Sequence, residues 1–182
     1  MRKVIAAFNT TIDGNCDHTA GIADEELHQH YTSLLNHAGA ILYGRTTYQL
    51  MQYWQTLLKK PSGEKASDDF AKAINKIPKI VFSHHLKSTD WETAELATHP
   101  IELVINDLKQ QSGNDILVGS RSLIVQLINL NLIDELQLCI QPVIAGKGLS
   151  LFDNINDRTI FKLKRTKKFV NGAIILYYEP IK

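Results

Sequence analysis

One stretch, from Asp115 to Phe152, constrains the fold of this 182-residue chain more than any other part of the sequence. It begins with an apolar run, Ile116 to Val118, that contains no polar residue and is typical of a strand covered on both faces. The run ends at Gly119, and leucine and isoleucine then recur at helical spacing as far as Leu130. The stretch therefore predicts a buried strand that turns through a glycine into a helix.

The first turn of the predicted helix carries Ser120, Arg121 and Ser122. Free backbone N–H groups, side-chain hydroxyls and the positive end of the helix dipole would all face one point there. These groups make the turn a candidate site for an anion. The alternative interpretation is an ordinary turn between a strand and a helix, with an N-cap and no ligand.

Other apolar runs predict strands that are each followed by a glycine or a hydroxyl residue. The predicted strands are Val4 to Phe8, Ala40 to Tyr43 and Lys79 to Ser83, and Glu135 to Ile140 adds one that alternates apolar and polar residues. Gly14, Gly44, Ser83 and Gly119 all lie at or just beyond the ends of predicted strands. Because ligands of parallel sheets bind beyond the carboxyl ends of the strands, these positions predict one shared site.

Helical spacing and capping residues predict the helices between these strands. Asp24 is a suitable N-cap for the first helix, and Gly39 is the expected C-cap. Further helices are predicted through Leu50 and Trp54, over Asp68 to Asn75 and over Ile101 to Gln111, whereas Leu86 to Pro100 favours neither helix nor strand. Asn171-Gly172, between Arg158 to Phe169 and Ala173 to Glu179, predicts a C-terminal hairpin.

This order of elements predicts an α/β fold with three layers and a mixed, mostly parallel central sheet that ends in an antiparallel hairpin. A chain of 182 residues with 44% hydrophobic residues is ordinary for one compact domain. Residues 1–182 are therefore expected to form a single domain.

Charge and composition argue against several classes of function. The formal net charge is +1, which favours neither nucleic acid nor acidic membranes, and the basic cluster Lys162 to Lys168 indicates the solvated face of a strand. No apolar run is long enough to span a bilayer, and the N-terminus lacks the pattern of a signal peptide. Cys16 and Cys139 form no disulfide framework. The simplest interpretation is a reduced, cytoplasmic protein without a metal site.

Several short motifs occur in an order that resembles one known family. They are Thr11-Ile12-Asp13-Gly14, Gly44-Arg45-Thr46-Thr47-Tyr48, Lys79-Ile80-Val81-Phe82-Ser83, Ile116-Leu117-Val118-Gly119-Ser120, Leu132-Ile133-Asp134-Glu135-Leu136 and Pro142-Val143-Ile144-Ala145-Gly146-Lys147-Gly148. Together they resemble the dihydrofolate reductase-like fold. They are most similar to the reductase domain of the bifunctional riboflavin-biosynthesis deaminase/reductase and its stand-alone bacterial relatives. The signature of the zinc deaminase half, His-x-Glu with Pro-Cys-x-x-Cys, does not occur in the sequence.

The resemblance implies a reductase with NADPH as its cofactor and a small molecule as its substrate. The implied cofactor-binding residues are Ala7, Ile12, Gly44, Arg45, Thr46, Thr47, Ser83, Gly119, Ser120, Arg121 and Ser122. Among them, Arg45 would contact the adenosine 2′-phosphate through its guanidinium fork, and Ala7 and Ile12 would line the nicotinamide. Asp13, whose counterpart in the family lies beside the substrate ribose, is the implied catalytic residue.

Two features depart from the family pattern. Many relatives have Gly-Gly where this chain has Gly119-Ser120, and the serine would either weaken diphosphate binding or add a hydroxyl contact. The loop from Asn15 to Thr19 lacks the basic residues that a phosphorylated ribose would favour. The exact step of riboflavin synthesis therefore stays open.

The resulting prediction is an NADPH-dependent reductase that transfers hydride to a small heterocycle or imine, similar to 5-amino-6-(5-phosphoribosylamino)uracil reductase or dihydrofolate reductase. The alternative is a catalytically inactive nucleotide-binding protein that keeps the fold. A homodimer is a further expectation, because the C-terminal hairpin and the apolar stretch Val170 to Tyr178 could pair two subunits.

Overall fold

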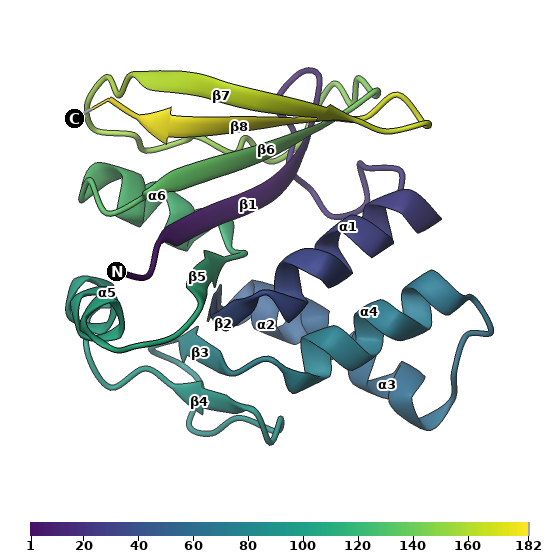
Figure 1. Cartoon of the computed structure of the whole chain (residues 1–182), viewed down its shortest axis with the longest axis horizontal. Coiled ribbons are helices and arrows are strands. Elements are labelled where there is room, and N and C mark those ends of the chain that lie inside the picture. Colours follow the sequence, from purple (N-terminus) through teal and green to yellow (C-terminus); the bar gives the residue numbers. More distant parts are fainter. Residues whose placement is uncertain (182) are drawn as a thin grey trace.

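A computed structural model of the chain describes residues 1–181, which contain an eight-stranded sheet flanked by helices (Figure 1). The strands are β1 (Val4–Thr11), β2 (Ala38–Gly44), β3 (Lys79–Phe82), β4 (Ala94–Leu96), β5 (Asp115–Val118), β6 (Glu135–Gln141), β7 (Phe161–Lys168) and β8 (Ile174–Pro180). The helices are α1 (Glu25–Asn36), α2 (Arg45–Met51), α3 (Tyr53–Lys59), α4 (Lys65–Lys76), α5 (Ile101–Gln110) and α6 (Arg121–Asn129).

The strand order across the sheet is β4-β3-β2-β5-β1-β6-β8-β7. Neighbouring strands from β4 to β6 run parallel, whereas β8 pairs antiparallel with both β6 and β7. The predicted mixed, mostly parallel sheet with a C-terminal antiparallel hairpin is confirmed.

The strands at the centre of the sheet are buried, whereas those at its edges are not. Ile116, Leu117 and Val118 of β5 are almost inaccessible to solvent, as expected for a strand that is apolar on both faces. At one edge, β7 carries exposed basic residues along most of the segment Lys162 to Lys168. At the other edge, β4 is only three residues long. Charge and brevity are two common ways of protecting an open sheet edge from pairing with another strand.

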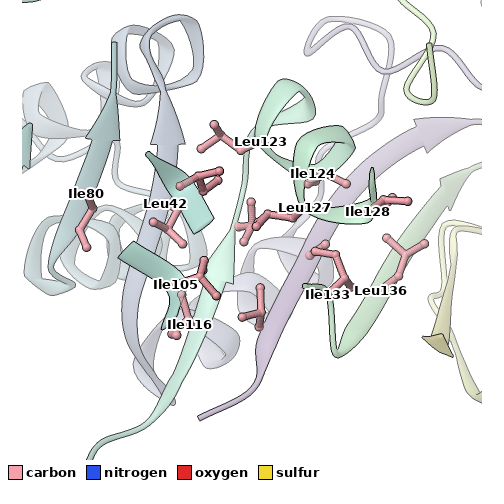
Figure 2. Close-up of a cluster of buried hydrophobic side chains, with 14 residues drawn as sticks. Leu42, Ile80, Ile105, Ile116, Leu123, Ile124, Leu127, Ile128, Ile133 and Leu136 are labelled. Carbon is pink, nitrogen blue, oxygen red and sulfur yellow. The ribbon is translucent and has the colours of Figure 1, made fainter. Parts of the chain in front are cut away.

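Helices cover both faces of the sheet, which confirms the three-layer α/β/α architecture (Figure 1). On one face, α5 and α6 pack onto the central strands through a cluster of buried aliphatic side chains. Figure 2 shows this cluster, to which α6 contributes Ile124 and Leu127 and β5 contributes Ile116. On the opposite face, Leu35 of α1 and Ile74 of α4 belong to a second buried cluster, together with a tyrosine of α2.

The C-terminal hairpin turns at Asn171-Gly172, as predicted, and Gly172 adopts a φ of +90° there. Ile175 and Tyr177, on one face of β8, are buried together with Leu27 of α1 in a third apolar cluster. Much of the apolar surface that suggested a subunit contact is therefore used inside the chain.

The predicted helix cap at Gly39 is wrong. Helix α1 ends at Asn36, and Gly39 lies inside β2. A Cβ atom at Gly39 would come within 2.8 Å of the Arg2 guanidinium and 2.9 Å of the Asn114 carbonyl oxygen. The glycine therefore allows the close approach of these groups and does not end the helix.

The helix predicted through Leu50 and Trp54 is divided in two. Helices α2 and α3 meet at Gln52, which itself keeps right-handed helical backbone angles. The stretch Leu86 to Pro100, whose pattern favoured neither helix nor strand, contains the short strand β4. The N-cap prediction at Asp24 is confirmed, because its carboxylate accepts a hydrogen bond from the backbone N–H of Leu27 at 2.8 Å.

Candidate functional site

The carboxyl edge of the sheet has a notch at the end of β5. Val118, the last residue of β5, pairs with Ala6 of β1 and with Leu42 of β2, and both neighbouring strands continue beyond it. Helix α6 leaves β5 toward one face, whereas α1 and α2 leave β1 and β2 toward the other face. Neighbouring strands whose connections leave toward opposite faces open a crevice, and ligands of α/β sheets bind there. The notch is therefore the candidate site.

Two of the loops predicted to bind an anion meet at this notch. The N–H of Gly44 donates a hydrogen bond to Oγ of Ser120 at 2.8 Å. Ser120 is buried at the N-cap of α6, and a Cβ atom at Gly44 would lie 3.3 Å from Oγ of Ser122. A hydroxyl that accepts one hydrogen bond still has a proton to donate. Through its bond with Gly44, Ser120, the serine that departs from the family pattern, joins the turn after β2 to the turn after β5.

Gly119 is required by packing inside the protein. A Cβ atom there would lie 2.9 Å from Cε1 of Tyr43, a buried residue of β2. Real Cβ atoms essentially never approach a neighbour so closely, so a side chain at this position would displace the tyrosine ring. Packing against Tyr43 is therefore enough to explain Gly119, without a role for its backbone in the approach to a bound phosphate.

The first turn of α6 faces this meeting point. Its backbone N–H groups have no partner within the helix, because the first intrahelical bond runs from the N–H of Ile124 to the carbonyl oxygen of Ser120 at 2.9 Å. Ser122 is exposed, and the turn contains no acidic residue that would offset the positive end of the helix dipole. The turn can accept an anionic ligand without rearrangement of its backbone.

The other predicted cofactor-binding residues on the β2–β5 side of the notch lie around the end of β2. Arg45 and Thr46 are exposed and Thr47 is half-buried at the start of α2. Ser83 follows β3, whose last residue pairs with Gly44. Its Oγ accepts hydrogen bonds from the backbone N–H groups of the second and third residues after it, at 3.1 and 3.0 Å. The hydroxyl of Ser83 therefore stabilises its own turn as well as standing near the site.

Ala7 and Ile12 lie on the other side of the notch, along β1. Ala7 follows Ala6, the partner of Val118, so its register places it beside Gly119. Ile12 lies further along the chain, is 61% exposed and donates its N–H to the carbonyl oxygen of Val143 at 2.9 Å. The structure therefore brings Ala7, but not Ile12, level with the end of β5.

Asp13, the predicted catalytic residue, holds a loop in place. Its carboxylate accepts hydrogen bonds from the Thr11 hydroxyl and from the backbone N–H groups of Ala145 and Gly146, the latter two at 3.2 and 2.7 Å. These three donors, the Thr11 hydroxyl foremost, lower the pKa of Asp13 to about 2. Asp13 is therefore ionised at neutral pH and has no proton to donate to a substrate.

The loop of residues 142–153, hereafter the 142–153 loop, is tethered at two more points. Asn15 donates a hydrogen bond from Nδ2 to the carbonyl oxygen of Lys147 at 3.0 Å, and a Cβ atom at Gly148 would lie 1.9 Å from the same Nδ2 atom. Arg121 donates from Nε to the carbonyl oxygen of Ser150 and forms an ion pair with Asp153 at 2.8 Å. Arg121, which was predicted to cradle a pyrophosphate, already has partners in this loop.

No sequence pattern indicates a functional role for Asn15, Ser150 or Asp153, which lie far from their partners along the chain. These contacts join individual polar groups across long stretches of sequence, and no periodic pattern marks such contacts. The one available signal in the loop is the pair of glycines at positions 146 and 148, and both adopt positive φ angles, +78° and +157°.

Within residues 1–181, no three His, Cys, Asp or Glu side chains are grouped so that they could hold a metal ion. No helix in this range has both the length and the apolar character needed to cross a membrane. Cys16 and Cys139 are buried free cysteines.

Comparison with known proteins assigns the family. The model of the RibD C-terminal domain matches residues 2–175. The uncharacterized protein YyaP of Bacillus subtilis (strain 168) is 32% identical over 183 residues, which cover 98% of this chain and 95% of that protein. The uncharacterized protein YwjB of the same organism is 35% identical over 72 residues, covering 39% of this chain and 41% of that protein.

Solved structures share the fold. The putative riboflavin biosynthesis protein from Shewanella sp. PV-4 has a TM-score of 0.76 at 15% identity, and all of both chains is covered. A pyrimidine reductase-like protein from Corynebacterium diphtheriae has a TM-score of 0.68 at 18% identity, with 100% of this chain and 92% of that chain covered.

A third solved structure is a larger protein. It is a diaminohydroxyphosphoribosylaminopyrimidine deaminase/5-amino-6-(5-phosphoribosylamino)uracil reductase from Thermotoga maritima, with a TM-score of 0.65 at 17% identity. The match covers 99% of this chain and 57% of that one. The family model spans nearly the whole chain, from before β1 to the start of β8. The protein described here therefore belongs to the family of the RibD C-terminal domain.

Proposed function

We propose that this protein is an NADPH-dependent reductase that transfers hydride to a small heterocyclic or imine substrate. One observation carries the proposal: the hydrogen bond from Gly44 to Ser120 joins the start of α2 to the N-terminus of α6 at the notch. Phosphate groups suit this place, because unpaired backbone N–H groups and the exposed Ser122 hydroxyl surround it. The RibD C-terminal family, and relatives described as reductases, support the same assignment.

Arg45 would set the preference for NADPH over NADH. Its exposed guanidinium begins α2, next to Gly44, and a guanidinium binds phosphate through two parallel hydrogen bonds. Ala7, level with the end of β5, would lie against the nicotinamide. When bound, NADPH would supply the hydride, and the protein would orient it and keep water away from the reacting carbon.

Asp13 would position the substrate. Each carboxylate oxygen has more than one acceptor site, so the bonds from the 142–153 loop leave room for one from a substrate N–H or O–H group. Because the carboxyl group is ionised at neutral pH, the proton that completes the reduction would come from another donor or from water.

Titration of nucleotide fluorescence tests the cofactor assignment. We expect the wild-type protein to bind NADPH about 10–100-fold more tightly than NADH, because charge-assisted hydrogen bonds contribute about 1.5–3 kcal/mol. Arg45→Ala should abolish this preference and leave the affinity for NADH unchanged. Arg158→Ala, which removes an exposed arginine near the opposite edge of the sheet, is the control. Equal and negligible binding of both nucleotides would reject the proposal.

A second candidate function is nucleotide binding without catalysis. It is favoured by the state of Asp13, whose carboxylate is ionised and already bonded to Ala145 and Gly146. Oxidation of NADPH should be followed at its nicotinamide absorbance with a panel of pterins, pyrimidines and flavin precursors. Turnover of any of them would exclude this candidate, whereas tight NADPH binding with no turnover across the panel would favour it.

A further inference from the structure

The two sides of the candidate site differ in charge. The sequence contains no lysine or arginine between Lys3 and Arg45, a segment that forms β1, the loop after it, α1 and β2. The acidic residues of this segment are Asp13, Asp17, Asp24, Glu25 and Glu26. Arg45, the first cation after the segment, follows β2, and β5 separates β2 from β1 in the sheet. The β1–β6 side of the notch, where a substrate would lie, is therefore acidic.

The acidic residues lie at the same edge as the notch. Asp13 follows the end of β1, and Asp24, Glu25 and Glu26 line an open groove of about 440 Å³ with Val170 and Asn171 of the hairpin turn. This turn is at the carboxyl edge, because the first residue of β8 pairs with the penultimate residue of β6. The negative charges therefore lie along this edge of the sheet, from the turn after β1 to the groove between the start of α1 and the hairpin turn.

The nearby cations do not offset this charge. Arg121 is paired with Asp153 and bonded to the Ser150 carbonyl oxygen. Among the described residues of the 142–153 loop, Lys147 is the one basic side chain, and it is exposed. At the hairpin turn, β7 ends with Lys168 and with Lys167, whose Nζ lies 4.7 Å from the centre of the Phe169 ring. Beside Asp13 and the 142–153 loop, a phosphate would therefore meet the carboxylate of Asp13 and a single lysine.

The backbone position best suited to a phosphate is already filled. Successive N–H groups that point at one spot form an anion-binding nest, and those of Ala145 and Gly146 both donate to the Asp13 carboxylate. Gly146 has a φ of +78°, which gives the loop this shape. The carboxylate stays ionised down to low pH, so protonation does not empty the nest or relieve the repulsion. The protein thus supplies its own anion where a ligand phosphate would otherwise bind.

We infer that the substrate carries no phosphate group, and is a neutral or cationic heterocycle or imine that the acidic β1–β6 side selects over its phosphorylated analogue. The inference rests on the proposed function, because it concerns the substrate that would stand beside the bound nicotinamide. It separates this protein from the relative described as a 5-amino-6-(5-phosphoribosylamino)uracil reductase.

The test uses protein saturated with NADP⁺, so that the phosphate positions of the cofactor are filled and no turnover occurs. Ribose 5-phosphate is titrated while backbone amide NMR shifts of the 142–153 loop are followed, and no saturable shift is expected. In the same complex, the dephosphorylated form of 5-amino-6-(5-phosphoribosylamino)uracil should bind at least about tenfold more tightly than the phosphorylated form, because like charges repel at short range. Saturable binding of ribose 5-phosphate, or equal or tighter binding of the phosphorylated compound, would overturn the inference.

A pair of double variants tests whether the acidic charge and the filled nest are what exclude phosphate. Asp13→Ala combined with Asp17→Lys removes the acceptor from the nest and reverses one charge, and should make ribose 5-phosphate binding saturable. Asp107→Lys combined with Asp157→Asn makes the same change in net charge at exposed positions elsewhere and should not. If the first variant also fails to bind ribose 5-phosphate, charge is not what excludes phosphate. Failure of the wild-type protein to bind NADP⁺ would instead reject the proposed function, so the two failures are distinguishable.

Discussion

The two sides of the notch are held together by different forces. On the β2–β5 side, one hydrogen bond between Gly44 and the buried Ser120, and the close contact of Gly119 with Tyr43, join the two turns. On the β1–β6 side, the 142–153 loop is tethered by the buried Asn15 and by two charged contacts nearer the surface, those of Asp13 and of the Arg121–Asp153 ion pair. Packing in a buried place responds little to salt or pH, whereas exposed charge contacts respond to both. The first side is therefore a rigid base for a ligand, and the second can open locally at low cost.

The largest effect is expected from Gly148→Ala. The new Cβ atom would lie 1.9 Å from Nδ2 of the buried Asn15, whose side chain would have to leave its place. Overpacking of this kind costs about 2–3 kcal/mol of the free energy of unfolding. Urea unfolding measures the loss, and NADPH affinity should stay unchanged, because Gly148 is on the β1–β6 side. In a double-mutant cycle with Asn15→Ala the two losses should not add, and additive losses would show that the clash is not the cause.

A smaller loss of stability is expected from Ser120→Ala on the other side. The variant removes the acceptor of the Gly44 N–H in a buried place, which costs about 1–2 kcal/mol. Thermal unfolding should show a fall in Tm of about 2–4 °C for each kcal/mol in a chain of this size. NADPH binding should weaken as well, in contrast to Gly148→Ala. Ser122→Ala, at an exposed serine in the same turn, is the control for stability, and an equal loss there would contradict the role given to Ser120.

The pH dependence of the free energy of unfolding should reveal how much the ionised carboxylate of Asp13 stabilises the protein. Its pKa is about 2 in the folded protein and 3.8 as an ordinary carboxyl group, so the folded state binds fewer protons than the unfolded state between these values. The stabilisation by Asp13 is complete above about pH 4 and is lost as the pH falls through about 2. In urea unfolding from pH 5 to pH 2, the Asp13→Asn variant should lose less stability with falling pH than the wild-type protein. Parallel pH curves would show that the 142–153 loop does not depend on this carboxylate.

The smallest effect is expected from Asp153→Asn. The side chain of Asp153 is 55% exposed and that of its partner Arg121 is 23% exposed, so the ion pair should contribute less than about 1 kcal/mol. The loss should shrink as salt is added, because exposed charges are screened. Asp157→Asn, in the chain just after the loop, is the control. A loss above that range, unaffected by salt, would mean that the tether at Arg121 is not an ordinary surface contact.

The sequence predicts the elements of this fold better than the contacts between them. The apolar run before Gly119 and the helical spacing after it correctly predict β5 and α6, because both signals are local. The contact of Gly44 with Ser120 depends on the insertion of β5 between β2 and β1, which no local pattern specifies. A local rule also misled at Gly39, where a glycine after a helical pattern suggested a cap although tertiary packing required it.

In the candidate site, too, features set by local sequence patterns could be predicted, whereas contacts between distant segments could not. Residues at strand ends, such as Arg45 and Ser122, are predicted at the correct edge because the carboxyl ends of parallel strands meet there. The partners of Asp13 and Arg121 could not be predicted, because they belong to a loop without periodicity far along the chain. The location of Asp13 could thus be inferred from the sequence, whereas its hydrogen-bonded, ionised state could not.

The unequal edges of the sheet have a consequence for solubility. At β4 an added strand would find only three residues to pair with, but β7 offers eight, which is enough for a stable ladder with a second molecule. What opposes that pairing is mutual repulsion between basic side chains such as Lys162 and Lys168. Their repulsion reaches only about 3 Å in 1 M salt. The ionic strength of the medium, which leaves the buried core untouched, therefore governs whether these molecules remain separate at high concentration.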